Sequence, residues 1–243
     1  MLTTRAEHLS DSVALYLGDC RDVLPMIERA DVVVTDPPYG VGLGANGPTA
    51  IGKTAYASFE DTPDYVRSVC VPVIETCLKR FGRVVMTPGN RNAFAYPMPD
   101  EVGTIYNPAG AGFSRWGITT SQPILYYGKD PRGVEKMPQS LQSTETVEKN
   151  GHPCPKPFKL MRWLVNRASV PGEIVLDPFM GSGTTGVAAV RLGRKFIGIE
   201  FEPTYYEIAR ARIADALARP DLFITQPARA ERPAGFFDST GRP

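Results

Sequence analysis

The sequence predicts a doubly wound α/β fold with a mostly parallel sheet. Short apolar runs recur along the chain, and most of them lack the alternation of a strand that has one face in water. Stretches with apolar residues at helical spacing separate these runs. Strands that alternate with helices are typical of a parallel sheet covered by helices on both faces.

Six apolar runs are expected to form the strands. Their continuous apolar character indicates strands that are buried on both faces. These runs are residues 13–17, 31–35, 83–87, 124–127, 173–177 and 195–200.

Three of the predicted helices begin at a proline, because proline fits the first helical turn. The first begins at Thr62 and Pro63, and Pro72 is expected to kink it. The other two begin at Pro157 and Pro203. Their apolar faces are Val66, Val69, Val73, Ile74 and Cys77 in the first, Phe158, Met161, Leu164, Val165 and Ala168 in the second, and Tyr206, Ala209, Ile213 and Leu217 in the third.

Three segments do not follow this pattern. Residues 40–58 are rich in Gly, Ala and Thr and are expected to form a mobile loop. Residues 91–117 contain many Pro and Gly residues and little periodicity. Residues 220–243 are rich in Pro, Ala and Arg, which predicts a flexible C-terminal tail after a single domain over residues 1–219.

The composition is that of an ordinary globular protein, with 42% hydrophobic and 22% charged residues. No apolar run approaches the ~20 residues of a membrane span. The first residues lack the apolar core of a signal peptide, so a cytoplasmic location without a membrane partner is expected. The net charge of +1 gives no general support for nucleic-acid binding. Residues 153–172 contain four basic residues and no acidic ones, which alone is more typical of a solvated helix face than of a binding patch.

A metal site is not expected. The cysteines at positions 20, 70, 77 and 154 include no CxxC pair, and the chain has only two histidines. We expect reduced and mostly buried thiols.

A glycine-rich segment follows the predicted strand 173–177 and opens a helix predicted over 184–192. It reads Asp-Pro-Phe-Met-Gly-Ser-Gly-Thr-Thr-Gly, and its glycines at 181, 183 and 186 spell GxGxxG. Such glycines allow a tight turn, close approach of a cofactor and close packing of the helix on the sheet. Glu200 ends the next strand, near the usual distance for a carboxylate that binds a ribose.

This pattern alone leaves open a turn without a ligand, a dinucleotide site, or a site for S-adenosylmethionine. A pyrophosphate-binding loop normally starts directly at the strand end, whereas Asp-Pro-Phe-Met precedes the first glycine here. Asp177 would repel a pyrophosphate but can bind an ammonium. Because S-adenosylmethionine carries an α-ammonium and no phosphate, it is the predicted cofactor.

A second motif, Asp36-Pro37-Pro38-Tyr39, follows the apolar run 31–35. Two consecutive prolines fix a rigid, extended turn, in which the Pro37 carbonyl is expected to point outward without a ladder partner. This carbonyl and the Asp36 carboxylate could accept both N–H groups of an exocyclic amine. Tyr39 could stack on a base that has left the duplex. The alternative is a Pro-Pro turn with a surface Asp and Tyr.

Together the two motifs resemble those of the DNA amino-methyltransferases, whose catalytic tetrapeptide is (D/N/S)PPY and whose cofactor loop is similar to DPFxGxGTT. Residues 177–185 match the loop in full. The catalytic motif precedes the cofactor motif here, and that circularly permuted order is similar to the β group of this family. The resemblance covers about residues 13–213.

Three further elements support the resemblance. Tyr16-Leu-Gly-Asp-Cys resembles the element in which an acid, here Asp19, meets the cofactor adenosine. His152-Pro-Cys-Pro-Lys-Pro resembles the HPxxKP element, which leads into a helix beside the methionine end of the cofactor and places Lys156 there. Residues 82–88 resemble the strand that closes the target pocket.

The resemblance implies a Rossmann-like methyltransferase domain of the S-adenosylmethionine-dependent type, with a seven-stranded sheet. It implies site-specific, direct in-line transfer of a methyl group to N6 of adenine in DNA, with the target base flipped out and no metal. The implied catalytic residues are Asp36, Pro37, Pro38 and Tyr39. The implied cofactor-binding residues are Asp19, Lys156, Asp177, Phe179, Gly181, Gly183, Thr184 and Glu200.

Family members often carry a target-recognition insert where this chain has only residues 128–151. Short recognition elements are therefore expected within 40–58, 91–117 and 128–151. We expect DNA to meet a local basic cluster that includes some of Arg83, Arg91, Arg115 and Arg132. The recognition sequence, the oligomeric state (monomer or homodimer) and an accompanying restriction enzyme stay open.

Three alternative functions remain. N4 of cytosine is the other amine that such a motif could hold. A non-catalytic DNA- or cofactor-binding protein would not need the intact Asp36, Tyr39 and glycine loop. A nicotinamide dehydrogenase would explain GxGxxG but would leave the DPPY motif unexplained.

Overall fold

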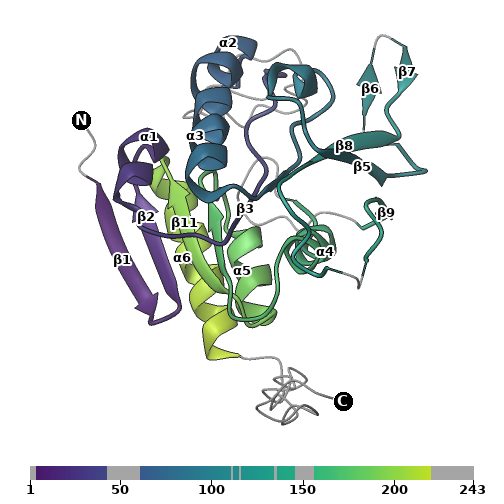
Figure 1. Cartoon of the computed structure of the whole chain (residues 1–243). Helices are drawn as coiled ribbons and strands as arrows, with labels where there is room; N and C mark the ends of the chain where they lie inside the picture. The colour runs from purple at the N-terminus through teal and green to yellow at the C-terminus, as the bar shows by residue number, and fades with distance from the viewer. Residues whose placement is uncertain are drawn as a thin grey trace, which may run out of the picture.

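The computed structural model describes residues 4–42, 61–110, 112–114, 116–133, 136–145 and 156–219. Their main feature is one mixed sheet between two layers of helices (Figure 1). The strands of this sheet are β1 (Arg5–Ser10), β2 (Val13–Leu17), β3 (Val32–Thr35), β4 (Val84–Met86), β5 (Glu101–Tyr106), β8 (Ser121–Tyr127), β9 (Leu141–Gln142), β10 (Ile174–Asp177) and β11 (Lys195–Glu200). A separate hairpin of β6 (Phe113–Ser114) and β7 (Gly117–Ile118) projects beyond the end of the sheet (Figure 1).

Among the described residues the sheet has nine strands, in the order β1-β2-β11-β10-β3-β4-β8-β5-β9. The five strands from β2 to β4 pair in parallel, so the doubly wound, mostly parallel α/β fold is confirmed. The expected count of seven strands is wrong. Strand β1 pairs antiparallel with β2 at one edge, and the two-residue β9 pairs with β5 at the other.

All six strands expected from apolar runs are present, with ends that differ by at most three residues. The missed strands carry a weaker signal. In β1 every residue keeps some exposure, because an edge strand contacts one neighbour and few apolar side chains. Strand β5 lies in the Pro- and Gly-rich segment 91–117, where no strand was expected, and it pairs with β8 over six residue pairs.

The helices are α1 (Cys20–Val23), α2 (Pro63–Tyr65), α3 (Val71–Phe81), α4 (Phe158–Ala168), α5 (Thr184–Arg191) and α6 (Pro203–Ala218), with short 3-10 turns at Leu24–Met26 and Ala93–Ala95. A π-helical turn, Val66–Cys70, joins α2 to α3. The distortion expected near Pro72 therefore takes the form of a π turn, which satisfies the backbone just before the proline.

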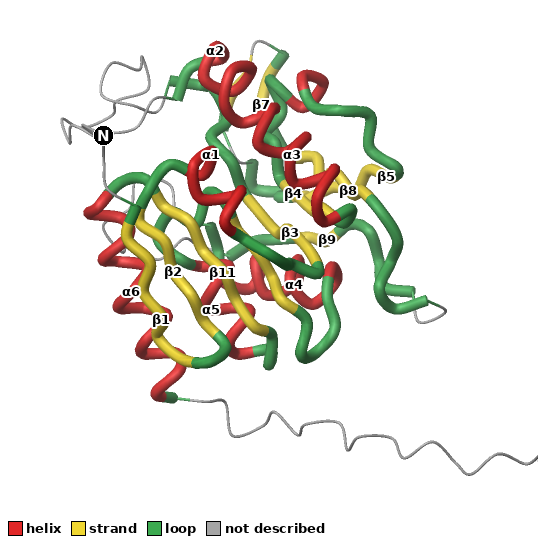
Figure 2. The backbone as a smooth tube through the Cα atoms, turned by 60° about the vertical axis from the view of Figure 1, so that its left-hand side comes forward, coloured by secondary structure: helices red, strands yellow, loops and turns green. Residues whose placement is uncertain are grey.

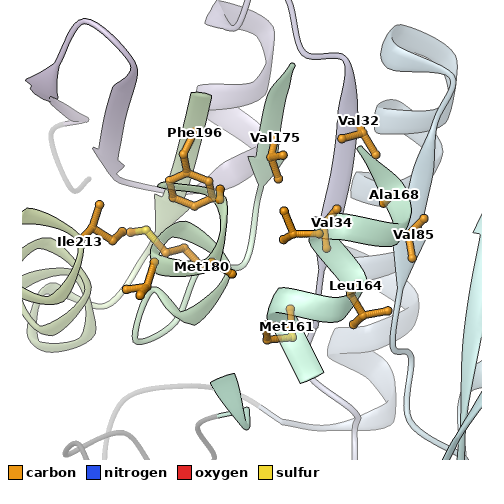
Figure 3. Packing of buried hydrophobic residues seen from close by; sticks show 14 of the residues in the cluster. Val32, Val34, Val85, Met161, Leu164, Ala168, Val175, Met180, Phe196 and Ile213 are labelled. Carbon is orange, nitrogen blue, oxygen red and sulfur yellow. The ribbon is translucent and has the colours of Figure 1, made fainter. Parts of the chain in front are cut away.

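Two apolar clusters fill the space between the layers, one on each face of the sheet. Helices α1 and α3 cover one face, while α4, α5 and α6 cover the other (Figure 2). Figure 3 shows the cluster on the face covered by α4, α5 and α6, in which Val34 and Val175 of the sheet face Met161 and Leu164 of α4. The predicted faces of the helices at Pro157 and Pro203 are buried here, apart from the partly buried Phe158 and Leu217.

The thiols of Cys20, Cys70 and Cys77 are free and buried, as expected, while Cys154 lies outside the described residues. Burial raises the pKa of both Cys70 and Cys77 to about 12, so these thiols are protonated at neutral pH. In the part of the chain that the structure describes, no helix has the length and apolar character needed to cross a membrane.

Candidate active site

A cavity of about 450 Å³ opens at the carboxyl ends of three neighbouring strands, β3, β10 and β11. Both sequence motifs line it, the Asp36–Tyr39 turn after β3 and the loop that starts at Asp177 after β10. Because β10 pairs directly with β3, two motifs that are far apart in the chain face one space. The crevice beyond the carboxyl ends of parallel strands is where α/β proteins bind ligands.

The glycine loop is fastened to the end of β11. The Gly181 N–H donates to Glu200 Oε2 at 2.8 Å, and the Glu202 N–H donates to Glu200 Oε1 at 2.8 Å. Gly181 has a φ of +53°, a conformation that favours glycine. The Glu200 carboxylate thus shapes the loop and also lines the cavity.

Gly183 does not line the cavity, which corrects its predicted contact with the cofactor. It caps α5 at a φ of +78°, and a Cβ there would lie 2.8 Å from Ala209 Cβ on α6. Gly186 has the packing role predicted for the third glycine, since its Cβ would lie 2.6 Å from a ring carbon of Phe196. Both glycines therefore allow close contact between secondary-structure elements rather than with a ligand.

Asp177 is almost fully buried, with 2% of its surface exposed. Its Oδ1 accepts from the Thr35 hydroxyl at 2.7 Å and from the Phe179 N–H at 3.1 Å. Burial raises the pKa of Asp177 to about 6, against the lowering effect of these hydrogen bonds. Burial likewise raises the pKa of Glu200 to about 7. A buried carboxylate and a half-buried one with raised pKa values suit a ligand with a cationic group and hydroxyl donors.

The other predicted cofactor residues Asp19, Phe179 and Thr184 also line the cavity. Asp19 caps α1, and its carboxylate accepts from the backbone N–H and the guanidinium of Arg21. Hydrogen bonding to Arg21 lowers the pKa of Asp19, so its carboxylate stays ionised. Thr184 accepts a hydrogen bond of 3.1 Å from Arg212 of α6.

Asp36 is held by three neighbouring side chains. Its Oδ1 accepts from the Tyr39 hydroxyl at 2.6 Å and from the Thr87 hydroxyl. Its Oδ2 lies 2.9 Å from Lys156 Nζ. The alternative of a free surface Asp and Tyr is therefore wrong, because the Asp36 side chain is only 19% exposed and is built into a polar cluster.

Tyr39 is fixed from both its backbone and its ring. Its carbonyl accepts from Asn92 Nδ2 at 2.7 Å, and the next N–H, of Gly40, donates to Asp61 Oδ1 at 2.6 Å. Gly89 lies so close that a Cβ there would come within 2.6 Å of the Tyr39 ring. Burial raises the pKa of Tyr39, so its hydroxyl is a donor at neutral pH.

Lys156 lies on the catalytic side of the cavity rather than only beside the cofactor loop. Its ammonium pairs with Asp36 and lies 4.4 Å from the centre of the Tyr39 ring. The residues 152–155, which complete the HPxxKP element, lie outside the described residues. Lys156 thus contacts two of the predicted catalytic residues directly.

Sequence reasoning missed four residues that shape the site: Thr35, Asp61, Thr87 and Asn92. All four are polar and buried, and two of them, Thr35 and Thr87, end or directly follow an apolar strand. Thr87 follows β4 in the segment expected to close the target pocket, and its hydroxyl contact with Asp36 agrees with that expectation. A polar residue at the carboxyl end of an apolar strand is the signal that could have identified Thr35 and Thr87.

The expected basic cluster is corrected for two residues. Arg83 precedes β4 and pairs with Glu173, which precedes β10, so it lies at the amino ends of the parallel strands, opposite to the cavity at their carboxyl ends. Arg132 bonds Asn166 near the end of α4, away from Lys156 at its start. Arg91 is exposed beside Asn92, whereas Arg115 and the predicted loop from 43 onward lie outside the described residues.

The chain is similar in sequence to known DNA methyltransferases. A family model described as DNA methylase matches residues 130–211. The Type II methyltransferase M2.DpnII of Streptococcus pneumoniae is 29% identical over 223 residues, which cover 76% of this chain and 83% of the relative.

Solved structures have the same fold at lower identity. The complex of M1.HpyAVI with SAM matches with a TM-score of 0.60 and 22% identity, covering 83% of this chain and 98% of that one. The PvuII DNA methyltransferase, described as cytosine-N4-specific, matches with a TM-score of 0.58 and 18% identity, covering 86% and 93% of the two chains.

Proposed function

Because this chain is a member of the DNA amino-methyltransferase family, we propose that it transfers the methyl group of S-adenosylmethionine to N6 of an adenine in DNA. The observation that carries the proposal is the single cavity lined by both motifs, with Asp36 on one side and Asp177 and Glu200 on the other. This arrangement supports a reaction between a bound cofactor and a bound methyl acceptor, because the motifs follow β3 and β10, which are paired neighbours in the sheet.

The residues of the glycine loop side fit the cofactor. The buried Asp177 carboxylate would bind the α-ammonium, and Glu200 would accept from ribose hydroxyls. Asp19, Phe179, Gly181 and Thr184 would form the remaining wall. When bound, S-adenosylmethionine supplies an electrophilic methyl group on its sulfonium.

The residues of the DPPY turn would hold the methyl acceptor. Asp36 and the Pro37 carbonyl would accept the N–H groups of an exocyclic amine and orient its lone pair towards the methyl group. Orientation of this kind contributes much of the rate of a direct transfer. Since such an amine is paired inside the duplex, the base must leave the stack, and Tyr39 would stack on it.

Adenine is proposed as the target because the motif begins with Asp, and DPPY in the resembling family is mostly associated with adenine N6. Cytosine N4 is the second candidate, since the similar fold of the PvuII enzyme serves a cytosine-N4-specific methyltransferase. Both bases offer an amine with two donors. Modification of DNA in a bacterial restriction–modification setting is the biological role that this activity supports.

The test is nucleoside analysis of DNA from cells that express the protein, with the Asp36→Ala variant as control. The proposal predicts N6-methyladenine with the wild-type protein and none above background with the variant. Detection of N4-methylcytosine alone would change the proposed target base to cytosine. Detection of neither methylated base with the wild-type protein would contradict the proposed activity. Methylation mapping of the same DNA would identify the recognition sequence.

A further inference from the structure

Lys156 makes two contacts that the proposed reaction assigns to the target base. Its Nζ lies 2.9 Å from Asp36 Oδ2, and it lies over the Tyr39 ring at 4.4 Å from the ring centre. The Lys156 and Asp36 side chains are only 13% and 19% exposed. A pair that is this well shielded from water is screened less than a surface ion pair.

The acceptors of Asp36 are largely occupied. Oδ1 accepts from the hydroxyls of Tyr39 and Thr87, while Oδ2 faces the ammonium. An ionised carboxylate offers about four lone-pair positions to donors. Because Oδ1 already accepts two hydrogen bonds, an amine that approaches Asp36 from the cavity would bind Oδ2, which is paired with the Lys156 ammonium.

We propose that Lys156 is a positioning residue that takes the place of the target amine on Asp36, and that it withdraws when the base enters. This inference rests on the proposed function. Before DNA binds, the ammonium supplies the opposite charge to a carboxylate that is largely shielded from water. When the base enters, an N–H donor of its amine replaces an N–H donor of Lys156, so that Asp36 keeps its hydrogen bonds.

The exchange also favours bases that carry an exocyclic amine on the pairing edge. Adenine and cytosine can replace the donor that Lys156 withdraws. Thymine presents a carbonyl acceptor at the corresponding position, which would leave the Asp36 carboxylate facing another acceptor. The exchange on Asp36 thereby disfavours thymine, which carries no exocyclic amine.

The test measures target-base extrusion in the Lys156→Ala variant. The probe is a duplex with the sequence found by methylation mapping and with 2-aminopurine beside the target base, in the presence of S-adenosylhomocysteine. Fluorescence of 2-aminopurine reports loss of stacking when the neighbouring base leaves. Because Lys156 no longer competes, we expect the extrusion equilibrium constant to rise at least about threefold, and KM for DNA to fall in parallel.

Two further variants make the result specific. Lys159→Ala removes the same charge from an exposed position on α4 and should leave extrusion at the wild-type value. Lys156→Arg restores a donor to Asp36 and should bring extrusion back towards the wild-type value. Damage to the fold would lower extrusion, so a gain in Lys156→Ala cannot come from misfolding.

The inference is overturned if Lys156→Ala extrudes the base no better than the wild type, or if it loses affinity for S-adenosylhomocysteine more than about threefold. The second result would assign Lys156 to the cofactor wall. A wild-type protein that methylates no DNA would contradict the proposed function, and this inference with it. Methylation by the wild type together with unchanged extrusion in the variant would contradict the inference alone.

Discussion

The Thr35 hydroxyl donates a hydrogen bond of 2.7 Å to Asp177 Oδ1, although the two residues are 142 positions apart in the chain. The Thr35 carbonyl in turn accepts from the Thr87 N–H, and the Thr87 hydroxyl donates to Asp36. The end of β3 thus joins the carboxylate of the cofactor loop to the carboxylate of the catalytic turn. This connection sets the relative position of the two proposed binding sites.

Replacing Thr35 by valine should loosen that connection. Thr35→Val keeps the shape of the side chain but leaves Asp177 without one donor, which costs about 1–3 kcal/mol of stability for a buried polar group. Thr35→Ser keeps the hydroxyl and should retain most of the stability and turnover. Urea unfolding and methyl-transfer rates of both variants check this. Equal stability and turnover in Thr35→Val and Thr35→Ser would show that the hydroxyl is not needed.

Gly183→Val should unfold the protein rather than block the cofactor selectively. A side chain at this position meets Ala209 of α6, and its φ of +78° is unfavourable for a β-branched residue. We expect loss of stability by several kcal/mol, in the range seen for overpacked cores and strained backbones. Thermal unfolding checks it. A stable variant that has lost only its affinity for S-adenosylhomocysteine would restore the role that the sequence predicted for this glycine.

Binding of S-adenosylhomocysteine should weaken as the pH falls below 7. Burial raises the pKa of Glu200 to about 7 and that of Asp177 to about 6, and the ligand's ammonium and hydroxyl donors favour the ionised forms. Protons therefore compete with the ligand, by up to ~10-fold per pH unit for each group below its pKa. Calorimetry between pH 5.5 and 8 would detect this. In Glu200→Gln the change near pH 7 should disappear while the change near pH 6 remains.

The same carboxylates give the opposite trend for the ligand-free protein. A folded-state pKa above the unfolded value means that the folded protein binds protons more tightly. The stability that protonation of Asp177 and Glu200 contributes is therefore lost as the pH rises from about 4 through 7.

An affinity for S-adenosylhomocysteine that does not change between pH 5.5 and 8 would contradict the assignment of both carboxylates to the cofactor.

Tyr39→Phe should keep substantial activity, whereas Tyr39→Ala should lose more. Phenylalanine keeps the ring for stacking but removes the hydroxyl that donates to Asp36 at 2.6 Å. We expect a loss of several-fold in turnover from a hydrogen bond to a charged group. Alanine also removes stacking worth roughly 1–3 kcal/mol per base, which should appear chiefly as a higher KM for DNA. Identical kinetics in both variants would exclude a stacking role for the ring.

Local patterns were sufficient for the central strands and for both motifs. Continuous apolar runs predicted β2, β3, β4, β8, β10 and β11, because strands buried on both faces need apolar side chains at every position. The DPPY turn and the glycine loop were recognisable since their prolines and glycines are required by local backbone geometry. Strands β1 and β5 lack such a signal, because both contain polar residues and stay partly exposed.

Contacts between distant segments were not predictable in the same way. The contacts of Thr35 with Asp177 and of Lys156 with Asp36 depend on the order of strands and on where α4 begins, and no local pattern encodes either. Gly183 was assigned to the cofactor because its pattern does not reveal that α6 packs against it. The sequence places Arg83 and Arg132 near the DNA for the same reason, although Arg83 lies at the opposite ends of the strands from the cavity and Arg132 lies near the end of α4.

The most direct test of the proposed chemistry is the rate of labelled methyl transfer from S-adenosylmethionine to unmethylated DNA by the Asp36→Ala variant, compared with the wild type. Asp36 lies on the acceptor side of the cavity, so affinity for S-adenosylhomocysteine should be nearly unchanged. Loss of a hydrogen-bond acceptor used in the transition state should reduce turnover by at least ~10²-fold. A variant that folds, binds the cofactor analogue and transfers methyl groups at the wild-type rate would contradict the central role of Asp36.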